Sequence, residues 1–161
     1  MFRRGIQHVL VRTLGWLPAQ LYGLVVRARH RLYDAGILPS QEGALPTLVL
    51  GNLTVGGTGK TPLTERLVLD LENILGKGSV GILSRGYGRD TSGFQWVTPQ
   101  STSAEAGDEP VMLARKLPHA AVAVCEDRLQ GLERMRDERP ELRWVVCDDA
   151  FQHRALKPTL S

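Results

Sequence analysis

A glycine-rich segment, TVGGTGKT, occupies residues 54–61 and has the residue types that hold a chain of phosphates. Glycines let backbone N–H groups turn toward phosphate oxygens, and the N-terminus of a following helix adds a positive dipole. A lysine at the end of such a loop reaches the β- and γ-phosphates, and the hydroxyl group after it holds Mg²⁺. The pattern therefore predicts a phosphate site rather than a purely structural glycine turn. Its eight residues are Thr54, Val55, Gly56, Gly57, Thr58, Gly59, Lys60 and Thr61.

The match to the strict phosphate-loop pattern has one departure, because Thr54 stands where that pattern has a glycine. The context nevertheless supports the assignment. An apolar run at residues 47–50 precedes the segment, and an amphipathic helical pattern follows it. A phosphate loop acts in this strand, loop and helix order.

A second candidate site is the pair Asp148 and Asp149, which follows the apolar run WVVC at residues 144–147. Nucleotide-binding proteins place a magnesium-directed carboxylate at the end of such a strand. Solvated acids at a strand end are the alternative, but a phosphate loop in the same chain favours a metal-directed pair. His153 lies close behind the pair and could take part in chemistry beside it.

Two other segments hold side chains that could reach the same site. Asp108 in GDEP is either a catalytic residue or a helix cap, since Pro110 follows it at a predicted helix start. Its loop falls on the edge where open α/β sheets bind ligands. In SRGYGR, residues 84–89, the side chains of Arg85 and Arg89 either bind phosphate or are solvated in a turn.

The elements that must position these side chains alternate between apolar runs and helical patterns from Pro46 onward. Nearly continuous apolar strands between helices are typical of a parallel sheet covered on both faces. We therefore predict an α/β fold, a P-loop NTPase-like parallel sheet with helices on both faces. Gly76 and Gly78 should end the first helix. The expected strands are 47–52, 80–83, 94–97 (a short extra strand), 120–124 and 144–147, and the expected helices are 61–75, 108–117 and 127–139.

Residues 1–38 form a basic arm ahead of this core, which spans residues 39–161. The first 33 residues hold six of the twenty basic residues and none of the seventeen acids, giving +6, whereas the remainder carries −3. An aliphatic face at helical spacing, interrupted by Pro18, lies opposite basic side chains. Its members are Ile6, Leu10, Leu14, Leu17, Leu21 and Leu24. We expect an amphipathic helix at an anionic membrane surface; a helix packed on the core is the alternative.

Composition excludes several other classes of protein. With 42% hydrophobic and 23% charged residues, the chain is neither a disordered tail nor a collagen-like fibre nor a coiled coil. Cys125 and Cys147 end apolar runs, so we expect reduced core thiols rather than a disulfide or zinc ligands. The charge-free stretch 14–26 is too short to span a bilayer. It also lacks a signal-peptide cleavage pattern. No nucleic acid partner is expected, because the aliphatic arm lacks aromatic stacking platforms.

Four motifs follow the basic arm in a fixed order: TVGGTGKTP, SRGYG, GDEP and DDAFQH. This arrangement closely resembles the tetraacyldisaccharide 4′-kinase family, which phosphorylates the lipid A precursor in Gram-negative bacteria. The resemblance implies a P-loop kinase that uses ATP and Mg²⁺ and lies peripherally at the cytoplasmic face of the inner membrane. Its substrate would be a lipid-bearing disaccharide 1-phosphate, phosphorylated on the 4′-hydroxyl to form lipid IVA. No protein partner is inferred.

The same resemblance implies roles for single residues. Asp108 looks like the base that accepts the sugar hydroxyl proton, and Lys60 neutralises charge during transfer. MgATP would be bound by Gly56, Gly57, Gly59, Lys60 and Thr61. The metal would be held by Thr61, Asp148 and Asp149. Candidate contacts to the substrate are Arg85, Tyr87, Gln152 and His153.

Two features depart from the family pattern. Ala150 replaces the glycine of DDGFQH, and alanine would strain the loop if that position needs a positive φ. Members of the family are also considerably longer, so we expect a C-terminal lobe to be absent here.

Two alternatives to this function stay open. One is a membrane-associated P-loop switch or partition ATPase with a protein partner, against which Val55 argues because the deviant loop has a lysine there. The other is a nucleotide-binding fragment without turnover.

Overall fold

The computed structural model describes residues 20–21, 23–51, 60–148 and 154–161. The chain divides between Ser40 and Gln41 into two compact units. In the first unit, residues 23–34 are helical, and the side chains of Leu21 and Leu24 are exposed. Within the described part of the chain, no helix has the length and apolar character needed to cross a bilayer. Most of the predicted aliphatic face lies outside the described residues, so the amphipathic arm stays a prediction.

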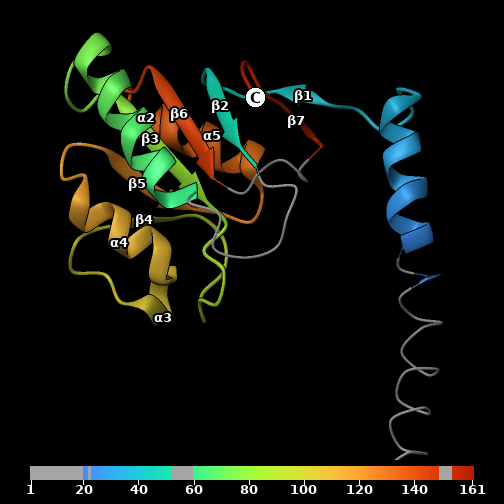
Figure 1. The fold of residues 1–161 in the computed structure, drawn as a ribbon, viewed down its shortest axis with the longest axis horizontal. Helices are drawn as coiled ribbons and strands as arrows, with labels where there is room; N and C mark the ends of the chain where they lie inside the picture. Colours follow the sequence, from blue (N-terminus) through green and yellow to red (C-terminus); the bar gives the residue numbers. More distant parts are fainter. Residues whose placement is uncertain (1–19, 22, 52–59, 149–153) are drawn as a thin grey trace, which may run out of the picture. The chain divides into compact units, whose positions relative to one another are not determined.

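The second unit is built around a five-stranded sheet with the order β2-β6-β3-β5-β4 (Figure 1). Its strands are β2 (Thr47–Leu50), β3 (Val80–Ser84), β4 (Gln95–Val97), β5 (Ala121–Val124) and β6 (Trp144–Asp148). Four of them run parallel, which confirms the predicted sheet. The exception is β4, which pairs antiparallel with β5. A loop without a crossover helix joins β3 to β4, so the helical connection that imposes a parallel direction is missing there.

Helices cover both faces of this sheet, as predicted (Figure 1). The helices are α2 (Lys60–Leu75) and α4 (Asp108–Lys116) on one face and α5 (Arg128–Glu138) on the other. Successive strand residues point to opposite faces. Ile82 therefore packs with Val68 and Leu113, whereas its neighbour Leu83 packs with Leu132. Each continuous apolar run thus supplies two hydrophobic cores at once.

Three short elements complete the second unit. The helix α3 (Ser103–Ala106) was not predicted, and it begins with a capping box in which Thr102 and Glu105 exchange hydrogen bonds. The strands β1 (Gln41–Glu42) and β7 (Leu156–Lys157) form a separate parallel pair. Gly76 follows the last residue of α2 with a φ of 101°, as predicted for the end of that helix.

The parallel strands all end at one edge of the main sheet. This carboxyl edge is where open α/β sheets bind their ligands. Gly51, Arg85, Cys125 and Asp148 therefore lie at or next to the same edge, although they are far apart in the sequence.

Candidate active site

Asp148 connects the carboxyl edge with the predicted phosphate loop. It is the last residue of β6, and in the parallel register it lies opposite Leu50, the last residue of β2. β2 leads into the loop, whose residues 52–59 lie outside the described residues. Asp148 is buried, with 1% of its surface exposed. Its carboxylate is therefore held on the strand next to the one that carries the phosphate loop. The remaining residues of that motif, 149–153, lie outside the described residues, and they include Asp149, Ala150, Gln152 and His153.

A hydrogen bond joins the phosphate-loop helix to the GDEP motif. α2 begins at Lys60, and the Thr61 hydroxyl donates to Oε1 of Glu109 at 2.5 Å. The residues are 48 positions apart in sequence, and the bond brings the first turns of α2 and α4 together. Sequence reasoning missed Glu109, although its position directly after Asp108 in GDEP was the signal that could have indicated it.

Asp108 is the first residue of α4, and its side chain is exposed. The helix cap is Gly107, which makes no side-chain hydrogen bond, so the alternative that Asp108 caps the helix is wrong. Gly107 has a φ of 89° and a ψ of 155°, a backbone conformation reached almost solely by glycine. The chain must turn sharply just before α4, and only a residue without a Cβ makes that turn. Glycine therefore occupies the cap position in place of Asp108.

The donor set at this edge suits Mg²⁺. Thr61 and Asp148 offer hydroxyl and carboxylate oxygens, which are the ligands that this hard cation prefers. Because the Thr61 O–H donates to Glu109, the lone pairs of its oxygen stay available to a cation. Among the described residues, no group of three or more His, Cys, Asp or Glu side chains could hold a metal. Mg²⁺ is usually held by one or two carboxylates together with substrate phosphates and water, so these residues fit such a site.

The SRGYGR segment leaves β3 at the same edge and holds two exposed side chains. Arg85 is exposed, and 92% of the surface of Tyr87 is accessible to solvent. Both could therefore meet a substrate that approaches this edge.

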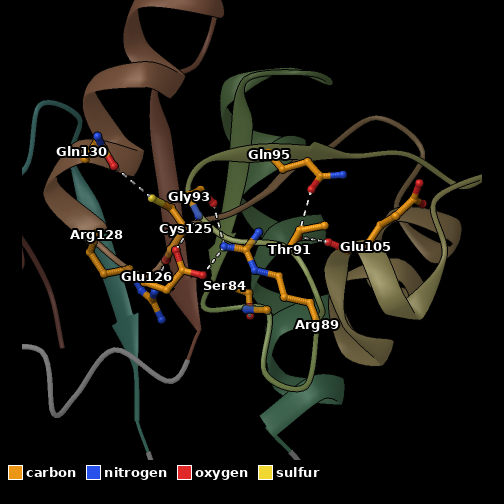
Figure 2. A network of polar contacts seen from close by, with 11 residues as sticks. Ser84, Arg89, Thr91, Gly93, Gln95, Glu105, Cys125, Glu126, Arg128 and Gln130 are labelled. Atoms are coloured by element: carbon orange, nitrogen blue, oxygen red, sulfur yellow. Dashed lines mark hydrogen bonds and ion pairs between the residues drawn. The ribbon is translucent and has the colours of Figure 1, made fainter.

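Arg89, the last residue of that segment, is not solvated, which was one of the two alternatives for it. Its side chain is only 2% exposed and forms an ion pair with Glu126 (Figure 2). The alternative that it is solvated in a turn is therefore wrong, because Glu126, which follows β5, closes over it. Partial burial would raise the pKa of Glu126, but the hydrogen bonds from Arg89 and from backbone N–H groups outweigh it and lower that pKa.

Arg128 is a buried cation that sequence reasoning did not single out. It begins α5 and is 2% exposed. Its guanidinium donates to the carbonyl of Cys125 (Figure 2). It also donates to the carbonyl of Asp148, at 3.4 Å. Burial, the largest cause, lowers the pKa of Arg128. The side chain therefore ties the end of β5 to the end of β6. In the sequence it resembles an ordinary charged residue on a solvated helix face.

Both cysteines are buried thiols, as predicted. Cys125 and Cys147 form no disulfide. Burial raises the pKa of each thiol, and that of Cys147 rises to about 12. These thiols are therefore protonated core groups and not nucleophiles.

Known proteins resemble this chain in sequence and in fold. The family model described as tetraacyldisaccharide-1-P 4′-kinase matches residues 11–161. A tetraacyldisaccharide 4′-kinase from Bacteroides thetaiotaomicron is 45% identical over 155 residues, covering 96% of this chain and 39% of the relative. The corresponding protein from Parabacteroides distasonis is 45% identical over 145 residues, covering 88% of this chain and 38% of its own length. The chain thus spans less than half the length of these relatives.

One solved structure has the same fold. It is a crystal structure of LpxK from Aquifex aeolicus in complex with ATP. Its chain is 37% identical to this one and superposes with a TM-score of 0.78, covering 88% of this chain and 45% of the other.

Proposed function

Because the chain belongs to the tetraacyldisaccharide-1-P 4′-kinase family, as its motifs predicted, we propose that it transfers the γ-phosphoryl group of ATP to the 4′-hydroxyl of a tetraacyldisaccharide 1-phosphate. The product would be lipid IVA, an intermediate of lipid A biosynthesis. The observation that carries the proposal is the hydrogen bond between Thr61 and Glu109. It links the phosphate-loop helix to the motif that contains Asp108. The bond supports the proposal because it joins the helix that follows the predicted phosphate loop to the helix that begins with the candidate base.

Phosphoryl transfer requires positioning and charge neutralisation more than covalent chemistry from the protein. Lys60 and the first turn of α2 would neutralise the β- and γ-phosphates. Thr61, Asp148 and Asp149 would hold Mg²⁺, which supplies charge stabilisation and orients the phosphates. These side chains account for the nucleotide half of the reaction.

Asp108 would serve the acceptor half of the reaction. Its carboxylate would orient the 4′-hydroxyl and take its proton as the oxygen bonds to the γ-phosphorus, while the bond from the γ-phosphorus to the bridging oxygen of ADP breaks. An exposed carboxylate suits this role, because it is open to the acceptor and the proton leaves late in a loose transition state. Arg85 and Tyr87 would contact the acceptor from the neighbouring loop.

The basic arm would hold the enzyme against the membrane that contains its lipid substrate. Six arginines without a single acid in residues 1–33 favour anionic headgroups, and the leucines suit the acyl boundary. We place the protein peripherally at the cytoplasmic face of the inner membrane, where ATP is available to it.

Replacing Asp108 with asparagine tests the proposed function. The longest product that the gene encodes is assayed with ATP and tetraacyldisaccharide 1-phosphate in detergent micelles. Loss of a base should lower kcat by about 10²- to 10⁴-fold and leave ATP affinity nearly unchanged. Since Gly107 is the helix cap, asparagine removes no capping bond, and the melting temperature should hardly move.

Asp137→Asn is the matched control, because Asp137 is an exposed aspartate on α5, away from the carboxyl edge. It should keep wild-type kcat. If Asp108→Asn also keeps most of the wild-type kcat, Asp108 is not the base. If the wild type binds ATP but transfers nothing to the acceptor, the chain is a nucleotide-binding fragment without turnover.

A further inference from the structure

The loop between β3 and β4 is tied down by side chains that the proposed reaction does not use. Arg89 donates through Nη2 to the carbonyl of Gly93 at 2.6 Å and also to the Glu126 carboxylate. Glu126 in turn accepts the N–H of Gly93 at 2.9 Å. The guanidinium and the carboxylate thus close the loop on itself and fasten it to the end of β5 (Figure 2).

The same loop is also fastened to α3. The N–H of Asp90 donates to the carbonyl of Ala104 at 2.7 Å, and the Thr91 hydroxyl donates to the carbonyl of Glu105 at 2.6 Å. α3 ends at Ala106, two residues before Asp108. The loop is therefore held on one side by β5 and on the other by the segment that leads into α4.

Backbone packing continues this connection to the candidate base. A Cβ on Gly86 would lie 2.7 Å from Cδ of Arg89 and 3.0 Å from the carbonyl oxygen of Ala106. A Cβ on Gly107 would lie 2.9 Å from the carbonyl oxygen of Tyr87. The backbone at Gly86 and Tyr87 thus lies between the Arg89 side chain and Gly107, the residue before Asp108. This close packing leaves no room for a side chain between Arg89 and the backbone that precedes Asp108.

Arg89 is poorly satisfied for a residue whose role is stability alone. Among the described residues, its Nε and Nη1 atoms are buried without a hydrogen-bond partner. Buried donors that lack partners destabilise a fold, and apolar side chains of similar volume often replace such cations without loss of stability. Its planar guanidinium, however, donates hydrogen bonds to the loop and to Glu126 from one fixed position. The ammonium group of a lysine, on its flexible side chain, would hold both partners less well.

We propose that Arg89, held by Glu126, is a positioning residue for the acceptor half of the reaction. Through Gly86 and Tyr87 it fixes Gly107 and hence the first residue of α4, Asp108. It also holds Tyr87 outward, where the sugar acceptor would approach. This inference rests on the proposed function, because it assigns to Arg89 a part in that reaction, and it places no contact between Arg89 and either substrate.

The test compares Arg89→Met and Glu126→Gln with the wild type in the longest product that the gene encodes. Arg89→Met nearly keeps the length of the side chain and removes the guanidinium N–H donors. Glu126→Gln removes the negative charge from the Arg89–Glu126 ion pair without a change of side-chain shape. Arg66→Met is the matched control, because Arg66 pairs with Asp70 on the exposed face of α2. Each variant is assayed for kcat, for the KM of tetraacyldisaccharide 1-phosphate, for ATP affinity and for the melting temperature.

We expect kcat/KM for the acceptor to fall by about 10- to 100-fold in Arg89→Met, since small displacements of a catalytic group have effects of this size. Glu126→Gln should lower it in the same direction by a smaller factor. ATP affinity should stay within about twofold of the wild type, because the bonds of Arg89 go to Gly93 and Glu126 and not to α2. The melting temperature of both variants should stay close to that of the wild type, and Arg66→Met should match the wild type throughout.

Amide hydrogen exchange tests the mechanical connection without any turnover. In Arg89→Met and in Glu126→Gln, residues 85–93 and 104–109 should exchange faster, while β6 and the second half of α2 stay unchanged. Unchanged exchange at residues 104–109 overturns the connection. Faster exchange with an unchanged acceptor kcat/KM overturns the positioning role. An equal loss of ATP affinity and acceptor kcat/KM would show a general structural role instead. If the wild type itself fails to transfer phosphate, the proposed function fails, and the exchange data alone decide whether Arg89 holds the loop.

Discussion

Replacing Gly107 with alanine should disturb the candidate site strongly. Gly107 has a φ of 89° and a ψ of 155°, and it directly precedes Asp108. The added Cβ would lie 2.9 Å from the carbonyl oxygen of Tyr87 and 3.3 Å from the carbonyl carbon of Gly86. Both contacts are with backbone atoms, so no side chain can rotate away to make room.

The magnitude has two parts. A non-glycine residue held in this region of φ and ψ destabilises the native state by about 1–3 kcal/mol. Forcing a methyl group against packed backbone adds about 1–3 kcal/mol, the usual effect of overpacking. We therefore expect a loss of about 3–4 kcal/mol in the free energy of unfolding. In a chain of this size that lowers the melting temperature by roughly 10 °C.

Gly88→Ala is the matched control for the first part. Gly88 also has a positive φ, 79°, but a Cβ there would meet no atom within 4 Å. It should therefore show only the backbone effect, about 1–2 kcal/mol. The difference between the two variants reports the close approach between Gly107 and Tyr87 together with any difference between their backbone conformations.

The assay is urea unfolding of both variants, followed by phosphate transfer under conditions in which each is folded. Gly107→Ala should unfold at clearly lower urea than Gly88→Ala, and its kcat should fall by about 10²-fold because Asp108 moves with the shifted backbone. ATP affinity should be nearly unchanged. Equal stabilities of the two variants would refute the close approach. A destabilised Gly107→Ala with full kcat would refute the placement of Asp108 as the base.

Three further predictions concern other parts of the chain. Lys60→Ala should lower kcat by at least about 10²-fold, since it removes one preorganised positive charge from the transition state, and near-normal turnover in a steady-state assay would contradict the phosphate loop. Burial raises the pKa of the Cys125 thiol above its ordinary value of 9.0, so a thiol reagent should label this thiol only after unfolding. The stability that the protonated thiol contributes is complete below pH 9.0 and declines as the pH rises above it. Unfolding at pH 8 and pH 10, compared with a Cys125→Ser control, would show this decline. Sedimentation with vesicles should show that the full chain binds anionic lipid, and that binding weakens in high salt and on deletion of residues 1–38; equal binding to neutral vesicles would refute the electrostatic part.

The elements of the core were largely predictable from local patterns. α2 was expected at 61–75 and spans Lys60–Leu75, and β6 was expected at 144–147 and spans Trp144–Asp148. Continuous apolar runs identify strands buried on both faces, because each residue there must meet one of two helix layers. The phosphate-loop motif and the order of the four motifs were sufficient to indicate the family, since they are short segments whose chemistry depends on residue type.

The direction of β4 and the surroundings of the site residues depended on contacts between distant segments. β4 has three residues, too few for its pattern to specify a partner or a direction, so pairing with β5 determined both. Glu109 could be connected with Thr61 only once α2 and α4 had packed against the same face of the sheet.

The sequence by itself therefore determined the main strands and helices of the core, because those depend on the spacing of apolar residues and on glycines within a few positions. The phosphate loop stays a prediction, since residues 52–59 lie outside the described residues. Only the tertiary structure decided that Arg89 is buried, because the carboxylate that closes over it, Glu126, lies 37 residues away on another strand's loop. The same holds for Asp108. Its type and neighbours allowed both a cap and a base, and only the turn at Gly107, packed against Tyr87, removed it from the cap position.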